Sequence, residues 1–92
     1  MAFTESTILA LTPVASFQSL GEGAVILLTD SGQMYTCNET TEMFLGAVDG
    51  KRSVADIIDV ALKEFEVDRE TLRADFLALA ADLANQGIVK VV

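Results

Sequence analysis

The run from Asp49 to Ile88 constrains the fold of this chain more than any other segment, because it contains two helices whose ends are marked by capping residues. Ser53 is followed three residues later by Asp56, which resembles a capping box with Asp in place of the usual Glu or Gln. Asp68 is a good N-cap for the second helix, and Gly87 followed by an apolar residue is typical of a glycine C-cap. The sequence therefore predicts two helices joined by a turn too short to separate them.

The residues before this run predict a small antiparallel sheet. Residues 14–20 alternate loosely and are typical of an edge strand, whereas the apolar run 24–28 predicts a strand covered on both faces. The Asp-Ser-Gly sequence at 30–32 predicts a hairpin turn, because Asp and Ser favour turns and Gly accepts positive φ. Residues 33–37 then form the returning strand.

A short helix and a closing segment complete the expected elements. Asn38 is a good N-cap for this helix, and Gly50 is expected to end it. Residues 88–92 predict a short closing strand or an apolar tail. We expect an N-terminal arm at residues 1–13, where no period is visible, and one domain at residues 14–92. The inward-facing residues of the short helix are expected to be Met43, Phe44, Ala47 and Val48.

The charge of the chain narrows its partners. Among 92 residues, 14 are acidic and 6 are basic, which gives a net charge of −8. Because Lys and Arg provide most of the affinity for phosphates, this balance disfavours nucleic acid and anionic membrane surfaces. No apolar run approaches the roughly 18 residues needed to cross a bilayer. The N-terminus also lacks the basic region of a secretory signal, so we expect a cytoplasmic protein.

The residue types that are absent disfavour catalysis. The chain has no histidine, which excludes a Ser-His-Asp triad, a Cys-His nucleophile and an imidazole metal ligand. Its single cysteine, Cys37, excludes an internal disulfide and a zinc site built from several cysteines. Catalysis would depend on carboxylates, lysine or tyrosine alone. We therefore expect a binding protein that is not an enzyme and has no metal site and no cofactor.

The helix that follows Asp68 is apolar around most of its circumference. Such a helix is either deeply buried or has a second face that contacts a partner. Asp75 and Asp82, two turns apart, lie close together on its remaining polar flank. One apolar stripe contains Leu72, Phe76, Leu79 and Leu83, and Leu77, Ala80, Ala81 and Ala84 widen it.

Taken in order, these features resemble the PqqD-like family. The resemblance covers roughly residues 14–89: an apolar strand, the Asp-Ser-Gly hairpin, a strand ending at Asn38, a short helix, and the sequence DGKRSVADII…VDRETLRADFLALAADLANQGIV. It implies a RiPP recognition element, which binds the leader peptides of ribosomally made and then modified peptides. The implied fold is α+β and winged-helix-like, with a three-stranded antiparallel sheet followed by three helices.

The resemblance also implies partners. A leader peptide adds as an extra antiparallel strand beside the third strand and packs against the third helix. A maturase then acts on the precursor peptide. This is a radical SAM enzyme in pyrroloquinoline quinone biosynthesis or a leader peptidase in lasso-peptide pathways. The segment SGQMYTCNETTEMF looks more like the stand-alone lasso-type members, but the helical half fits both branches, so the pathway stays open.

Strand addition is physically reasonable, because a small sheet has unpaired backbone groups along its edges. By position, the resemblance implies two walls of a peptide site. The accepting edge would be formed by Met34, Tyr35, Thr36 and Cys37, and the opposite wall by Asp75, Phe76, Leu79 and Asp82. The alternative for the strand is that Tyr35 and Cys37 only pack in the core. The alternative for the helix is that its carboxylates are solvated surface charges.

Other functions remain open. A winged-helix DNA-binding domain would use Arg69 and Arg73 near the start of the last helix, although Glu70, Asp75 and Asp82 would repel phosphate. A general protein-interaction module would use the same surfaces without a peptide substrate. A carboxylate enzyme based on the two aspartates is a more distant alternative. The strand edge could also pair with a second copy to form a homodimer.

Overall fold

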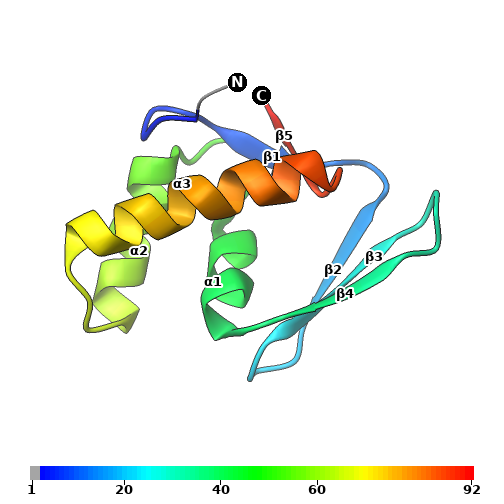
Figure 1. Ribbon diagram of the computed structural model, residues 1–92, viewed down its shortest axis with the longest axis horizontal. Helices are drawn as coiled ribbons and strands as arrows, with labels where there is room; N and C mark the ends of the chain where they lie inside the picture. Colours follow the sequence, from blue (N-terminus) through cyan, green and yellow to red (C-terminus); the bar gives the residue numbers. More distant parts are fainter. Residues whose placement is uncertain (1–2) are drawn as a thin grey trace.

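Eight regular elements follow one another in residues 3–92, which is the part of the chain that the computed structural model describes (Figure 1). Within these residues no helix is both long and apolar enough to cross a membrane. The elements are β1 (Leu9–Leu11), β2 (Ala15–Ser19), β3 (Ala24–Leu28), β4 (Met34–Cys37), α1 (Glu39–Ala47), α2 (Val54–Glu64), α3 (Arg69–Asn85) and β5 (Val89–Val91).

The strands β2, β3 and β4 form an antiparallel sheet in that spatial order, and the three helices follow it along the chain. This confirms the expected α+β fold with a three-stranded sheet followed by three helices. In β3, Ala24, Ile26 and Leu28 are buried, whereas Val25 and Leu27 are only half-buried. The expectation that this strand is covered on both faces is therefore wrong. The helix α1 packs against one face of the sheet, and the other face is open to solvent.

The two ends of the described chain form a second sheet. β1 pairs antiparallel with β5, and Leu9, which lies opposite Val91, is almost fully buried. The closing strand expected at residues 88–92 is thus confirmed, whereas β1 lies in the segment expected to be an N-terminal arm. A strand of three residues is too short to show a period of two, so no pattern revealed it. Residues 1–2 of that arm lie outside the described residues.

Each helix begins at the residue expected to cap it, which is Asn38 for α1, Ser53 for α2 and Asp68 for α3. The Ser53 hydroxyl accepts a hydrogen bond from the Asp56 N–H at 3.2 Å. The Asp56 carboxylate accepts one from the Ser53 N–H at 3.1 Å. This reciprocal pair is the predicted capping box, and it satisfies N–H groups that have no partner within the first turn of the helix.

The helix α3 ends at the predicted glycine. Gly87 has a φ of 79°, and the N–H of Ile88 donates to the carbonyl of Leu83 at 2.9 Å. This arrangement is a Schellman motif whose apolar residue is buried in the core. The helix α1 instead ends at Ala47, before Gly50, where it was expected to end. Gly50 adopts a left-handed conformation in the loop, and its N–H bonds to β1.

The aromatic rings of Phe44 in α1 and Phe76 in α3 meet in the core. Both side chains are fully buried, and their ring centroids lie 5.0 Å apart with an angle of 76° between the planes. This edge-to-face geometry adds a favourable electrostatic contact to the burial of two large apolar groups. Leu45, which was not expected to face inward, is also buried. The two rings hold α1 and α3 together.

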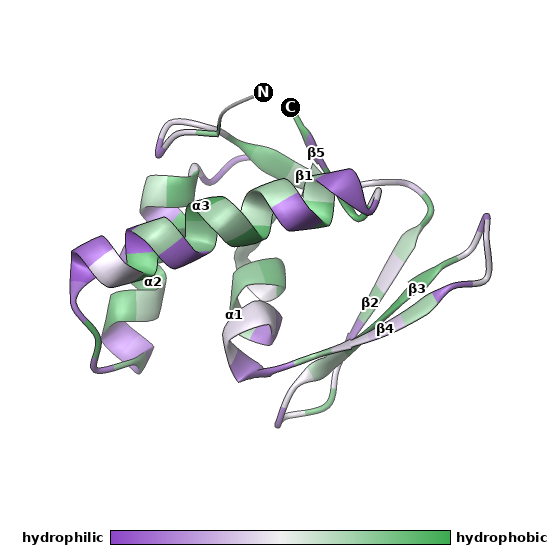
Figure 2. Ribbon diagram, viewed as in Figure 1, coloured by the Kyte–Doolittle hydropathy of each residue, from purple (hydrophilic) through white to green (hydrophobic). Residues whose placement is uncertain are grey.

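The helix α3 presents a narrower apolar stripe to the core than the sequence indicated. Leu79 is only half-buried, because Ala80 occupies the inward position beside it. Figure 2 shows hydrophilic residues at the hairpin tips and around the α2–α3 connection, and a strongly hydrophobic β3. One side of α3 therefore packs into the core, and another side faces solvent. The buried residues of α3 are Leu72, Phe76, Ala80 and Leu83.

Replacing Phe76 by Ala should lower the free energy of unfolding by about 3–5 kcal/mol, because it removes a fully buried ring and leaves a cavity beside Phe44. Urea denaturation followed by circular dichroism measures this change. Leu79→Ala removes a half-buried side chain from the same helix and should lower stability clearly less. An equal loss in the two variants would contradict the central position of Phe76.

Candidate functional site

The hydrogen-bond register fixes which backbone groups of β4 are engaged. The N–H of Leu28 in β3 donates to the carbonyl of Gln33 at 2.8 Å, and Ile26 and Ala24 lie opposite Tyr35 and Cys37. Hydrogen-bonded pairs recur at every second residue of an antiparallel ladder. The N–H and C=O groups of Tyr35 and Cys37 are therefore directed toward β3.

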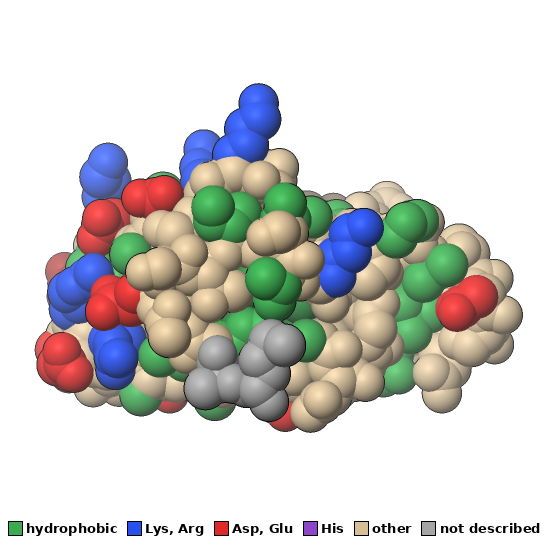
Figure 3. All heavy atoms as spheres, turned by 90° about the horizontal axis from the view of Figure 1, so that it is seen from above, with side chains coloured by type: hydrophobic (Ala, Val, Ile, Leu, Met, Phe, Trp, Pro, Cys, Tyr) green, Lys and Arg blue, Asp and Glu red, His purple; other side chains and the backbone are tan. Residues whose placement is uncertain are grey.

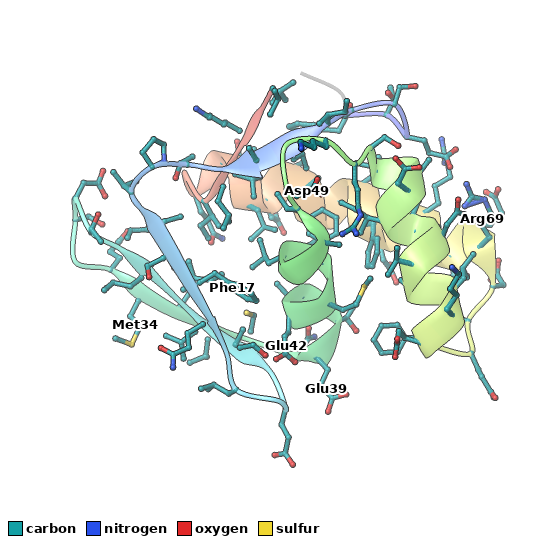
Figure 4. All side chains as sticks on the ribbon, turned by 180° about the vertical axis from the view of Figure 1, so that it is seen from behind. Phe17, Met34, Glu39, Glu42, Asp49 and Arg69 are labelled. Atoms are coloured by element: carbon teal, nitrogen blue, oxygen red, sulfur yellow. The ribbon has the colours of Figure 1, made fainter. Side chains whose placement is uncertain are left out.

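By the same alternation, the backbone groups of Met34 and Thr36 are directed away from β3. β4 is the last strand of its sheet, so these two residues present two N–H and two C=O groups along a free edge. Their side chains lie on the solvent face of the sheet, and Met34 is 65% exposed. Figure 4 shows Met34 pointing away from the helices. The segment is thus an unpaired edge with an exposed outer face.

The other two predicted strand residues face the core. Tyr35 and Cys37 are half-buried and pack against the hydrophobic core. The Tyr35 hydroxyl donates to the Gln33 side chain at 3.1 Å, and the Cys37 thiol donates to the Ala24 carbonyl at 3.4 Å. Burial raises the pKa of the Cys37 thiol, and the negative charge of Glu42 acts in the same direction. Packing therefore accounts for both side chains.

The four predicted residues of α3 separate into exposed and buried ones. Asp75 and Asp82 are exposed, and Leu79, between them on the helix, is half-buried. Phe76 has no exposed surface, since its ring is in the core beside Phe44. The flank of α3 that reaches the surface therefore consists of the half-buried Leu79 between two exposed carboxylates. Phe76 packs beneath this flank in the core.

The edge of β4 and the helix α3 lie on the same side of the molecule. In Figure 1 α3 crosses in front of α1, and β4 runs from the lower end of α1 along the near side of its sheet; in Figure 4, which is seen from behind, α3 lies behind α1 and β4 lies behind β2. Their relative position is fixed through α1, which begins at Asn38 directly after β4 and contacts α3 through Phe44 and Phe76. The structure thus brings the two predicted walls to one side of the fold.

The start of α3 is held by a cluster of ion pairs. Glu5 accepts hydrogen bonds from the guanidinium groups of Arg69 at 2.7 Å and Arg73 at 3.0 Å, and Arg69 also lies 3.6 Å from Asp59. Figure 3 shows acidic and basic side chains intermixed at this end of the molecule. These two arginines are therefore neutralised within the chain.

A cavity that the sequence analysis did not anticipate lies between α1 and α2. Its volume is about 460 Å³, and the turn between β2 and β3 contributes Gly21 to its wall. None of the eight predicted site residues lines it. It is built from segments far apart in the sequence, so no local pattern could reveal it. The one local signal is Gly46, a glycine inside a predicted helix. In residues 3–92 no group of three or more His, Cys, Asp or Glu side chains is placed to hold a metal ion.

Comparison with known proteins identifies similar folds and a family. A family model described as coenzyme PQQ synthesis protein D (PqqD) matches residues 23–89. The structure of TbiB1 in complex with the TbiA(beta) leader peptide matches with a TM-score of 0.81 at 17% identity, covering 88% of this chain and 94% of that one. The structure of lasso peptide synthetase B1 complexed with the leader peptide matches with a TM-score of 0.78 at 27% identity, covering 89% and 96%. No curated protein matches the sequence.

Cys37 should be alkylated by iodoacetamide near neutral pH more slowly than the same cysteine in a short peptide of residues 34–40, because burial shields the sulfur and raises its pKa. Mass spectrometry measures both rates. Unfolding in urea should abolish the difference. Equal rates for the folded protein and the peptide would contradict an inward-facing thiol.

Proposed function

The chain belongs to the coenzyme PQQ synthesis protein D (PqqD) family, and we propose that it binds the leader segment of a ribosomally made precursor peptide. The leader adds as an antiparallel strand to the free edge of β4 and packs against α3. The chain then presents the precursor to a maturation enzyme. Leader binding by the similar lasso peptide synthetase B1 supports this proposal.

The observation that carries the proposal is the unpaired backbone of Met34 and Thr36. Two donors and two acceptors in strand geometry match the backbone of an added strand, whatever its side chains. Backbone hydrogen bonds therefore provide affinity that tolerates changes in leader sequence. In this proposal Tyr35 and Cys37 contribute by holding the strand against the core, and the outward backbone groups of Met34 and Thr36 form the accepting edge.

Selectivity comes from α3. Leu79 offers an apolar contact, and the exposed carboxylates of Asp75 and Asp82 flank it. This chemistry favours a leader that places an apolar side chain beside a basic or hydroxyl-bearing one. Phe76 acts indirectly, because it is buried and keeps this part of α3 against α1.

We assign binding without catalysis to this chain, in the cytoplasm, where ribosomal precursors are made. The maturation enzyme is a radical SAM enzyme if the pathway is of the pyrroloquinoline quinone type, or a leader peptidase if it is of the lasso type. The family match favours the first, and the similarity to lasso peptide synthetase B1 favours the second. The neighbouring genes would distinguish the two.

The ion pairs at the start of α3 disfavour DNA binding, which is the competing function. A winged-helix domain would need free cations near the start of α3, but Arg69 and Arg73 are both paired with Glu5. The carboxylates of Asp75 and Asp82 further along the helix would repel phosphate. Self-pairing along the β4 edge is a separate use of the same backbone groups, and leader peptide would compete with it.

Replacing Thr36 by Pro should weaken leader binding by up to about tenfold, because it removes one outward N–H that can contribute roughly 0.5–1.5 kcal/mol. Calorimetry with a synthetic leader, taken from the precursor encoded beside this gene, measures the affinity. The ladder to β3 should survive, since the N–H of Thr36 does not take part in it.

Thr36→Val is the matched control, because it keeps the N–H and removes only the hydroxyl. It should bind the leader as tightly as the wild-type chain. Equal weakening in the two variants would assign the effect to the side chain. Unchanged binding by Thr36→Pro would exclude this edge as the site of strand addition.

Replacing both Asp75 and Asp82 by Asn should weaken binding of a leader with a basic residue opposite α3 by up to about fivefold, since an exposed ion pair contributes about 0.2–1 kcal/mol. The salt dependence of the affinity should also decrease. Asp30→Asn, at the exposed hairpin tip, changes the charge by one unit elsewhere and should have little effect. The same loss from Asp30→Asn would show that only net charge matters.

A further inference from the structure

We propose that the cavity between α1 and α2 docks a segment of the maturation enzyme in which an apolar side chain lies beside a basic one. This inference rests on the proposed function, since it assigns a surface to the enzyme that receives the leader. The cavity of about 460 Å³ is large enough for an aromatic side chain together with a guanidinium group. Its chemistry and its position support this occupant.

The less exposed part of the cavity wall, its floor, is apolar, and the exposed part, its rim, carries Glu39 and Glu64. Met43 and Ala47 of α1 and Val60 and Phe65 of the α2 region line it, and all of them except the buried Ala47 are half-buried. An apolar group from a partner would complete the burial of these side chains. The floor therefore selects an apolar side chain.

Two carboxylates on the rim are free to receive a cation. Glu39 and Glu64 are exposed, and within residues 3–92 neither takes part in an ion pair or a side-chain hydrogen bond. Glu42 is already engaged, because it accepts hydrogen bonds from the Ser19 hydroxyl and from the Gly21 N–H at 3.1 Å. The hydrogen bond from Ser19 is the largest cause that lowers the pKa of Glu42, and the bond from Gly21 acts in the same direction.

Arg52, the cation in the cavity wall, does not cancel the negative charge of the glutamates there. Arg52 lies 4.0 Å from Asp49, so its charge is partly compensated outside the cavity. Three carboxylates and one guanidinium leave the wall with an excess of negative charge. A second copy of this chain, with a net charge of −8, is a poor occupant, and a basic segment of another protein is a good one.

Gly46 is an independent sign that the cavity is kept open. It lies inside α1 and lacks the positive φ that favours glycine at the other five glycine positions of the chain. A Cβ atom built at this position meets nothing within 4 Å. Glycine inside a helix is less stable than alanine by roughly 0.5–1 kcal/mol. Neither backbone conformation nor internal packing explains Gly46, but the missing side chain leaves the cavity accessible.

The position of the cavity allows both partners to bind at once. Figure 4 shows Glu39 and Glu42 on the face seen from behind, whereas the β4 edge and α3 lie on the opposite face. A leader bound along β4 would leave the cavity uncovered. The α1 helix connects the two sites, because it begins directly after β4 and forms one wall of the cavity.

Nuclear magnetic resonance with the labelled full chain tests the inference with two small probes, acetyl-Phe-Arg-amide and acetyl-Phe-Glu-amide. At millimolar concentration the Phe-Arg probe should shift the amides of Met43, Ala47 and Val60, and the Phe-Glu probe should not. Gly46→Leu should fill the cavity and abolish these shifts. It should not destabilise the chain, because it improves helix propensity and its side chain points into open space.

Gly46→Ala adds only a methyl group and is the matched control, which should keep most of the probe binding. The double variant Glu39→Gln with Glu64→Gln should bind the Phe-Arg probe several-fold more weakly and remove the preference over Phe-Glu. All these variants should keep wild-type affinity for the leader, whose shifts appear at residues 34–37. No shifts with Phe-Arg, equal binding of Phe-Glu, or unchanged binding by Gly46→Leu would each overturn the docking site while leaving leader binding intact. Absence of leader shifts would instead overturn the proposed function, and with it the identity of the docked partner.

Discussion

The contact between Phe44 and Phe76 is the interaction on which the arrangement of this molecule depends. The two fully buried rings join α1 to α3, and α1 is joined to β4 by the Asn38 cap. The position of the exposed flank of α3 relative to the free edge of β4 is therefore set through α1, by this ring contact, by the Asn38 cap and by the packing of α1 against the sheet and of α2 against both helices. Packed interiors change shape little, so this contact keeps the two proposed walls of the peptide site at a constant separation.

The parts of this structure that could be predicted are those encoded locally. The caps at Ser53 and Asp68 and the glycine that ends α3 depend on a few adjacent residues, and all are confirmed. The pairing of β1 with β5 joins three-residue strands that are far apart in the sequence, and strands this short show no alternation of apolar and polar residues that would predict it. The predicted stripe on α3 could not distinguish Leu79 from Ala80, because a small rotation of the helix decides which of them faces the core.

The candidate site shows the same division. The sequence, with its family resemblance, led to the two segments that the structure brings to one side of the fold. The sequence could not show which predicted residues offer free backbone groups, which offer exposed side chains and which are buried. The direction of each N–H in β4, for example, depends on the register with β3. The cavity between α1 and α2 was missed, since three distant segments build it. The two proposed sites therefore differ in kind, since the leader would be recognised through backbone groups and the maturation enzyme through side chains.

Amide hydrogen exchange, with and without saturating synthetic leader, tests the central claim most directly. In the free chain, the amides of Tyr35 and Cys37 should exchange slowly because they bond to β3, and those of Met34 and Thr36 should exchange rapidly. On leader binding, the amides of Met34 and Thr36 should become protected as well. If they still exchange rapidly in the saturated complex while the outward amide of Phe17 on the β2 edge becomes protected, the leader adds to the other side of the sheet and the account is contradicted.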